Sequence, residues 1–307
     1  MTPSADEQAS RDGLVGTVEV VGAATLWGLS GIFSVVLFRS GVAPLDVAFF
    51  RPLVATALLL AWCLAFDRRA FRLPRGDLVV LWVVGGGVTA VFQIGYQMAT
   101  EAVGVPATVG LLYLAPALVM LFGGPLLGET PTGRQVGFGT LALAGVWAVV
   151  AGAGGSEVVL SPAGLAWGGL TAVGYAGYTL FGRWGGRRWP ALATVAHSYL
   201  GATVILGLLL PVTGPAQWPD DLRAQLILTV YGFATVALAV ILFYDALRRI
   251  PAARASIVAT IEPVVAALLA TVVLGQTLTP AGWLGLGLVV VGVVGASSRA
   301  RRPATPS

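Results

Sequence analysis

Lysine is absent from the sequence, so all eighteen of its basic residues are arginines. A Walker A phosphate loop needs its lysine, and the absence excludes an ATP-driven motor of that type. A Schiff base to retinal or to pyridoxal phosphate needs a lysine amine, so that chemistry is excluded too. We therefore expect a protein that works without a cofactor.

Cysteine and histidine are nearly absent as well, since Cys63 and His197 are the only examples. A single cysteine can form no internal disulfide, so the compartment has to be inferred from topology. A membrane-embedded enzyme would need a cluster of acids and histidines, or a nucleophile beside its base. One histidine, one cysteine and scattered acids provide neither a catalytic cluster nor a metal site, and we expect that the protein is not an enzyme.

Charge is the third scarcity. Only 10% of the residues are charged and 57% are hydrophobic, a balance that would leave a soluble protein of this length with too little polar surface. Forty-one glycines fit a bundle of closely packed transmembrane helices. The charges lie in short connectors between apolar runs, so the net charge of +4 gives no reason to expect nucleic acid. The expected partner is the lipid bilayer.

Ten apolar runs follow one another, each near the ~20 residues that a bilayer requires. The backbone must satisfy its own hydrogen bonds in lipid, so each run is expected to be a helix. The fold class predicted is therefore all-α integral membrane, with a disordered tail at 1–15 and a second tail at 299–307. The predicted transmembrane helices are 16–38, 44–66, 78–98, 106–127, 134–153, 162–183, 190–211, 223–244, 252–274 and 280–298.

The arginines are distributed unevenly between the two sides of this predicted topology. Fifteen lie in tails and connectors on the side of the N-terminus, whereas the other side has only Arg39 and Arg223. Arg51 lies within a predicted helix. Because cytoplasmic segments carry the excess of basic residues, we expect a multi-pass protein of the cytoplasmic membrane with both termini in the cytoplasm.

The second half of the sequence repeats landmarks of the first half at a spacing of 147 residues. Five residues of the first half recur in the second: Pro116, Gly128, Thr130, Thr132 and Gly145 reappear as Pro263, Gly275, Thr277, Thr279 and Gly292. Each copy, 16–153 and 162–298, holds five predicted helices, and an odd number makes the second copy enter the membrane from the opposite side. Inverted repeats of this kind are common in alternating-access carriers. Duplication also occurs in membrane proteins that carry nothing, so that alternative stays open.

Several short motifs occur in a characteristic order along the chain. They are Leu26-Trp27-Gly28, Phe49-Phe50-Arg51, Gly104-Val105-Pro106-Ala107, Pro116 with Leu127-Gly128-Glu129, Ala246-Leu247-Arg248-Arg249-Ile250, and Glu262-Pro263 with Leu274-Gly275. In this order and spacing the chain resembles the drug/metabolite transporter (DMT) superfamily, in its EamA-type branch with two tandem five-helix domains. The resemblance implies a carrier of small metabolites, often an exporter, that is proton-coupled, exchange-type or facilitative. One departure is Gly275-Gln276, where such proteins often have Gly-Glu.

Polar residues form stripes on several predicted helices at helical spacing. Helix 78–98 and its continuation carry Gly86, Thr89, Gln93, Tyr96, Gln97 and Thr100 on one face; helix 162–183 carries Trp167, Thr171, Tyr175 and Tyr178; Trp27, Ser30, Ser34 and Tyr113 lie on two others. Such a stripe must face protein or water and not lipid. Trp27, Ser30, Gln93, Tyr96, Tyr113, Tyr175 and Tyr178 are candidate substrate-binding residues. The alternative is that these groups only hydrogen-bond neighbouring helices.

Three ionisable residues inside predicted helices need separate interpretation. Glu262 lies ten residues into helix 252–274, about 15 Å deep at 1.5 Å per residue. An acid at that depth is costly and usually functional, so Glu262 is a candidate substrate-binding and proton-coupling residue. The alternative is a protonated, hydrogen-bonded acid or half of a fixed ion pair. Arg51 could pair with Glu262, bind a substrate carboxylate or reach the membrane interface. His197 is a second candidate for proton coupling.

The sequence thus predicts a secondary transporter, and more specifically an exporter, of a small polar or amphipathic metabolite such as an amino acid or amine, working by alternating access. The expected partners are a small-molecule solute, the bilayer and protons as a candidate coupling ion, in a monomer or homodimer. A membrane-embedded enzyme or a sensor without transport activity is the alternative.

Overall fold

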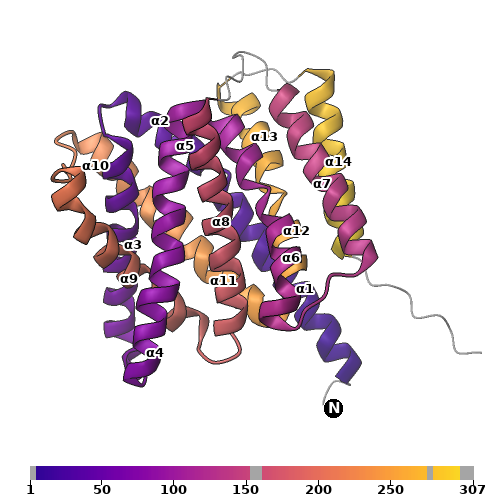
Figure 1. Cartoon of the computed structure of the whole chain (residues 1–307), viewed down its shortest axis with the longest axis horizontal. Helices are drawn as coiled ribbons and strands as arrows, with labels where there is room; N and C mark the ends of the chain where they lie inside the picture. The colour runs from indigo at the N-terminus through magenta and orange to yellow at the C-terminus, as the bar shows by residue number, and fades with distance from the viewer. Residues whose placement is uncertain (1–4, 153–160, 275–278, 298–307) are drawn as a thin grey trace, which may run out of the picture.

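The computed structural model describes residues 5–152, 161–274 and 279–297, and these form helices and connecting turns without any strand (Figure 1). The first half contains α1 (Ala5–Trp27), α2 (Ser30–Arg39), α3 (Pro44–Phe66), η1 (Arg68–Phe71), α4 (Arg75–Val80), η2 (Leu81–Gly85), α5 (Gly86–Leu112), α6 (Ala115–Leu127) and α7 (Gly133–Gly152). The second half contains α8 (Pro162–Gly185), α9 (Ala191–Thr213), α10 (Leu222–Tyr231), η3 (Gly232–Leu238), α11 (Ala239–Arg249), α12 (Ala252–Ala259), α13 (Glu262–Leu274) and α14 (Pro280–Ser297). The all-α prediction is confirmed for the described residues.

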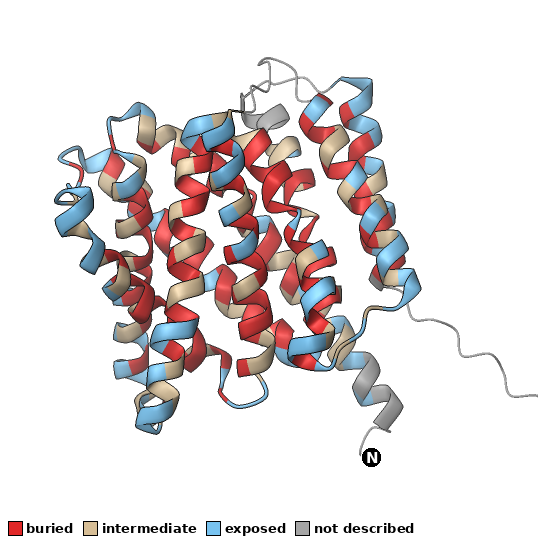
Figure 2. Cartoon of the chain, viewed as in Figure 1, coloured by how far each residue is buried: buried red, intermediate tan, exposed pale blue. Residues whose placement is uncertain are grey.

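The bundle exposes apolar side chains on its outside. Phe66, Leu121, Leu208, Val212 and Leu284 are all exposed, while polar residues such as Gln93, Gln97 and Thr171 are buried. Figure 2 shows that buried residues follow the inner faces of the helices. Apolar surface on this scale is typical of a protein whose solvent is lipid.

Seven of the described segments are long and apolar enough to cross a membrane. They are Arg11–Arg39, Pro44–Phe66, Arg75–Leu112, Gly133–Gly152, Ala191–Thr213, Leu222–Arg249 and Ala252–Leu269. Arg75–Leu112 counts as one segment, although Gly104 inside it has a left-handed φ of 77° that breaks the helix axis. The apolar helices α6 and α14 are shorter. The number of ten crossings therefore stays a prediction.

The two halves break their helices at equivalent positions. The first half is interrupted at Tyr113 and Leu114, between α5 and α6, and the second at Thr260 and Ile261, between α12 and α13. These positions are 147 residues apart, as are Pro116 and Pro263 just after them. Because proline has no backbone N–H to donate to the residue four positions earlier, each proline favours an interruption here.

Packing between α7 and α14 is reciprocal. The two helices lie side by side (Figure 1). A Cβ on Gly145 would lie 2.7 Å from the carbonyl oxygen of Gly285, and a Cβ on Gly292 would lie 2.7 Å from that of Phe138. Gly145 and Gly292 are 147 residues apart, and so are Phe138 and Gly285. A two-fold relation between the halves would produce contacts that repeat in this way with the partners exchanged.

A second contact joins a residue to its own equivalent. The hydroxyls of Thr56 on α3 and Thr203 on α9 lie 3.1 Å apart and form a hydrogen bond. The two threonines are 147 residues apart, and α3 and α9 themselves span equivalent ranges. Contact between a residue and its own equivalent is expected at the axis if the two halves are related by a two-fold rotation.

The arginine-rich connectors lie at the end of the bundle where the N-terminus lies (Figure 1). Hydrogen bonds and ion pairs link them to α1. Arg249 pairs with Glu19 of α1 at 3.2 Å, and Arg254 donates to Thr17 at 2.8 Å. We call this the N-terminal end. Its counterpart, the opposite end, contains the end of α2 and the start of α10 (Figure 1).

Candidate functional site

A small cavity lies among α1, α2, α3, α5, α8 and α13. Its volume is about 10 Å³, which is room for about one water molecule. It is lined by Trp27, Ser30, Arg51, Phe92, Tyr96, Leu112, Tyr175, Tyr178 and Glu262. Seven of the nine residues that the sequence nominated for substrate binding therefore line one cavity. The other two, Gln93 and Tyr113, form hydrogen bonds with residues of its lining.

Arg51 is turned into the protein and is only 2% exposed. Its Nη1 donates to Oε1 of Gln93 at 3.2 Å, and its Nη2 donates to Oγ1 of Thr235 at 2.9 Å. Its guanidinium carbon lies 4.2 Å from the centre of the Tyr231 ring, a cation–π distance. Of the orientations that the sequence left open, the structure has the inward one. Gln93, also nominated from the sequence, thus positions Arg51 and does not itself line the cavity.

The guanidinium of Arg51 has neutral neighbours. No ion pair in the described part of the chain involves Arg51, and its buried Nε has no hydrogen-bond partner. A buried charge is costly unless an opposite charge or a full set of hydrogen bonds compensates it. Arg51 therefore retains the capacity to bind an anion from the cavity.

Glu262 is the first residue of α13 and is 5% exposed. Oε2 of its carboxyl lies 2.8 Å from the hydroxyl of Tyr113, which also lies 2.7 Å from the carbonyl oxygen of Ala259. Pro263 has no backbone N–H to donate to that carbonyl, so the carbonyl oxygen of Ala259 is free to accept from the Tyr113 hydroxyl. Tyr113, nominated from the sequence, thus holds Glu262 across the break between α12 and α13.

The tyrosine hydroxyl between these two oxygens has a single proton. It can donate that proton fully to Ala259 or to Glu262 but not to both. When it donates to Ala259, the contact with Glu262 is a complete hydrogen bond only if the carboxyl carries a proton and donates it to the phenol oxygen. The arrangement can therefore accommodate the carboxyl in either protonation state.

Aromatic rings line the cavity that Arg51 and Glu262 share. The Tyr175 and Tyr178 rings lie 4.8 Å apart, Phe92 lies 5.4 Å from Tyr178, and Trp27 lies 6.0 Å from Tyr175. Trp27 is fixed by donating its Nε1–H to the carbonyl of Thr235 at 2.9 Å. Edge-to-face packing of this kind stiffens a wall while presenting both apolar faces and polar groups.

Two further polar groups of the cavity lack partners. The hydroxyls of Ser30 and Tyr175 are buried and make no hydrogen bond. Buried polar groups are normally hydrogen-bonded, and each exception in a native protein needs an explanation. Together with Nε of Arg51, these groups mark the cavity as a place where a polar ligand would find ready donors and acceptors.

Four further residues belong to this site and were not predicted from the sequence: Phe92, Leu112, Tyr231 and Thr235. Tyr231 and Thr235 are four residues apart on the predicted helix 223–244, so a search of that helix for polar spacing would have found them. Phe92 and Leu112 give no such signal, because an apolar residue in an apolar run carries no information about which side it faces.

His197 is placed away from this cavity. Its Nδ1 accepts from Nε1 of Trp82 at 3.2 Å, and its Nε2 lies 2.9 Å from the carbonyl oxygen of Ala70. That pairing requires the neutral tautomer with the proton on Nε2. The structure does not bring His197 to Glu262, and its role in proton coupling stays a prediction.

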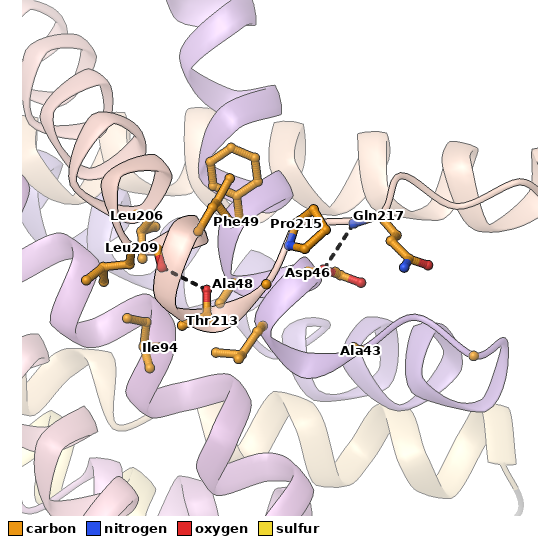
Figure 3. A pocket seen from close by; sticks show the side chains of 14 residues that line it. Ala43, Asp46, Ala48, Phe49, Ile94, Leu206, Leu209, Thr213, Pro215 and Gln217 are labelled. Atoms are coloured by element: carbon orange, nitrogen blue, oxygen red, sulfur yellow. Dashed lines mark hydrogen bonds between the residues drawn. The ribbon is translucent and has the colours of Figure 1, made fainter.

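A larger cavity of about 300 Å³ lies between α3, α5 and α9 near the opposite end (Figure 3). Its walls include Phe49, Ile94 and Leu206, and its one acid is Asp46. Asp46 accepts from the backbone N–H of Gln217 at 3.2 Å. No residue nominated from the sequence lines this cavity, and its lining contains a single charge. Of these two cavities, the smaller one brings a buried arginine and a buried glutamic acid together.

A model of the EamA-like transporter family matches residues 14–151 and, a second time, residues 162–298. The chain belongs to the EamA-like transporter family. The resemblance to the EamA branch of the drug/metabolite transporters is thereby confirmed, and the apolar helices are those of a membrane transporter.

Named EamA-like relatives align over nearly their whole length. The chain is 28% identical over 297 residues to YwfM of Bacillus subtilis (strain 168), an uncharacterized transporter, covering 92% of this chain and 94% of that protein. It is 28% identical over 289 residues to the threonine/homoserine exporter RhtA of Escherichia coli (strain K12), covering 91% of this chain and 86% of RhtA.

A solved crystal structure shares the fold of this EamA-like protein. The TM-score is 0.75 at 23% sequence identity, and the match covers 94% of this chain and 96% of the other. At this identity the likeness shows the arrangement of the helices and nothing about the solute.

Proposed function

We propose that this EamA-like transporter is a secondary carrier that exports a small polar metabolite, of the amino-acid or amine type, by alternating access. The observation that carries the proposal is the small cavity that buried Arg51 and Glu262 line together with aromatic residues. The alignment with the threonine/homoserine exporter RhtA supports the same solute class.

The scaffold of the proposal is an inverted repeat of two domains, 16–153 and 162–298, with ten crossings. Reciprocal contacts of Gly145 and Gly292 support it, as does the contact of Thr56 with Thr203. The cavity lies between the halves, because Arg51 comes from the first and Glu262 from the second. A site at the repeat interface can be exposed to each side in turn as the halves rock.

The orientation proposed puts the N-terminal end in the cytoplasm. Arginine-rich connectors gather there, and cytoplasmic segments carry that bias. The carrier would then take up its solute at the N-terminal end and release it at the opposite end.

An ion cluster supports the idea that the N-terminal end closes as one step of the cycle. Oε1 of Glu129 lies 2.6 Å from Nε of Arg183 and 2.9 Å from Nη2 of Arg187, and Oε2 accepts from the backbone N–H of Ala252 at 3.1 Å. Glu129 thus ties the end of α6 to α8 and to the start of α12. Breaking this cluster would free three helices to separate at that end.

Protons are the coupling ion that the geometry supports. Tyr113 can serve Glu262 in both of its protonation states, as argued above. A carboxyl that exchanges its proton with each side in turn would couple solute movement to a proton gradient.

Transport is tested with the purified protein in liposomes that contain a radiolabelled amino acid. A carrier releases the label when unlabelled amino acid is added outside, and empty liposomes or Glu262→Gln liposomes do not. Appearance of a chemically altered product would point to an enzyme. Absence of both flux and product for amino acids, amines and other small metabolites would leave the sensor as the better reading.

A further inference from the structure

Arg51 and Glu262 face the same small cavity from opposite halves of the chain. The described part of the structure shows no ion pair between them. We infer that the two residues recognise the two charges of one zwitterion: Arg51 binds the carboxylate and Glu262 binds the ammonium group. The inference rests on the proposed transport function and names the feature of the solute that the site selects.

Arg51 is a buried cation with unused hydrogen-bonding capacity. A guanidinium has five N–H donors in a planar fork. The two that the structure uses go to the neutral oxygens of Gln93 and Thr235, and Nε has no partner. A carboxylate matches the fork with two parallel hydrogen bonds and supplies the missing negative charge. Gln93, Thr235 and the Tyr231 ring keep the fork in place while the solute enters.

Glu262 has one carboxyl oxygen available to bind an ammonium group. The hydrogen bond that the described structure gives this carboxyl uses Oε2, so Oε1 can accept from a solute ammonium group. Tyr113 fixes the carboxyl at the first turn of α13, where it points into the cavity that Arg51 also lines. Release of the proton from Glu262 would supply the negative charge that an ammonium group needs.

The pair also excludes solutes with one charge. A simple amine would satisfy Glu262 but would place a second cation beside Arg51, and a simple carboxylic acid would place a second anion beside Glu262. A neutral solute would leave both charges uncompensated. Like charges in a desolvated site repel strongly, so selection works by rejection as well as by attraction.

Room for the solute has to come from movement, because the cavity in this state holds about one water. The helices around it are interrupted beside it, at Gly28 and Leu29, at Tyr113 and Leu114, and at Thr260 and Ile261. Rotation of short half-helices at these breaks can widen the cavity without unfolding the bundle. In this conformation the site is therefore too narrow for an amino acid, and binding requires a wider one.

The experiment compares three solutes that share one side chain: an amino acid, the amine left when its carboxylate is removed, and the acid left when its ammonium is removed. Competition with labelled amino acid is measured in liposomes with the wild type, Arg51→Gln, Glu262→Gln and the exposed control Arg223→Gln. For Arg51→Gln and Glu262→Gln, binding of each solute is read from thermal shift where transport is lost.

For the wild type and Arg223→Gln, removing the solute carboxylate should weaken binding about 10- to 100-fold, the range of a hydrogen bond to a charged group. In Arg51→Gln the same removal should change binding by less than about threefold. Glu262→Gln should show the corresponding loss of sensitivity to the ammonium group. Such a cycle between a solute group and a side chain isolates their direct interaction.

The outcomes separate the two proposals. If the wild type moves amino acids but Arg51→Gln and Glu262→Gln weaken all three solutes equally, the residues are structural and the zwitterion inference is wrong while the carrier stands. If no solute binds or moves in the wild type, the carrier itself is wrong. Should Arg51→Gln not fold, Arg51→Lys keeps the charge and must keep the preference for carboxylate-bearing solutes; equal binding of amine and amino acid by that variant would also overturn the inference.

Discussion

Gly145 and Gly292 occupy equivalent positions in the two halves and make equivalent contacts, whereas Arg51 and Glu262 have Ser198 and Ala115 at the equivalent positions. The comparison separates two kinds of constraint. The packing repeats, as it must if the proposed two-fold axis relates the two halves and makes them fit each other reciprocally. The cavity does not repeat, and this difference fits the proposed zwitterion, whose two ends carry different groups and need different residues to bind them.

The largest effect is expected where the halves differ most. Glu262→Gln replaces the one acid of the cavity by a neutral amide of similar size, and solute counterflow should fall by about 100-fold, the loss expected for a charged hydrogen bond in a desolvated site. The wild-type rate should vary with pH and the residual rate of the variant should not. Asp46→Asn, in the larger cavity, is the matched control and should retain transport. A Glu262→Gln protein that transports with an unchanged pH profile would remove this residue from the mechanism.

Substitutions that disturb the repeated packing should act alike in the two halves. Gly145→Ala and Gly292→Ala each place a Cβ 2.7 Å from a carbonyl oxygen of the facing helix, and overpacking of this kind costs about 1–3 kcal/mol. Both variants should unfold at lower temperature by similar amounts in detergent.

The chain offers a control on the same pair of helices. Gly137 on α7 and Gly287 on α14 have open space around the position of a Cβ. Alanine there should leave the unfolding temperature unchanged or raise it, because glycine inside a helix costs about 0.5–1 kcal/mol relative to alanine. Opposite shifts for Gly145→Ala and Gly292→Ala would contradict the two-fold packing.

The sequence predicted those features of the site that a single helix can show. A stripe of period 3.6 placed Gln93 and Tyr96 on one face, and the depth of Glu262 in its run marked it as unusual. Both inferences need only local spacing and the dimensions of a bilayer. The structure buries all three residues.

Features that depend on contacts between helices were beyond the sequence. The predicted helix 16–38 is interrupted at Gly28 and Leu29, where a Cβ on Gly28 would lie 3.0 Å from the Val265 side chain of α13. Thr235, a hydrogen-bond partner of Arg51, lies 184 positions away in the sequence. No periodicity within one helix encodes which distant helix lies opposite, so neither the break nor the partner could be predicted.

A smaller effect is expected at the N-terminal end, where the halves again differ in sequence. Glu129 holds two arginines, and the equivalent position in the second half is Gln276. Glu129→Gln should favour opening at that end by about fivefold, because a partly exposed ion pair contributes about 1 kcal/mol. Opening is measured as the rate at which a water-soluble maleimide labels Ser256→Cys, buried on α12, in a Cys63→Ala background. An unchanged labelling rate would mean that the cluster does not hold this end closed, and Asp245→Asn serves as a control acid at the same end.

The smallest effect is expected at the hydrogen bond between the two equivalent threonines. Thr56→Val or Thr203→Val removes one hydroxyl of the pair that lies 3.1 Å apart and leaves the other buried without its partner, at a cost of about 1 kcal/mol for each single variant. The double variant leaves no unpartnered hydroxyl, so it should be destabilised by less than the sum of the single variants. Thermal unfolding of the four proteins measures the difference. Because each threonine is the other's equivalent, the two single variants should also match each other closely; additive and unequal losses would show that the hydroxyls act independently and that this contact does not report the two-fold relation.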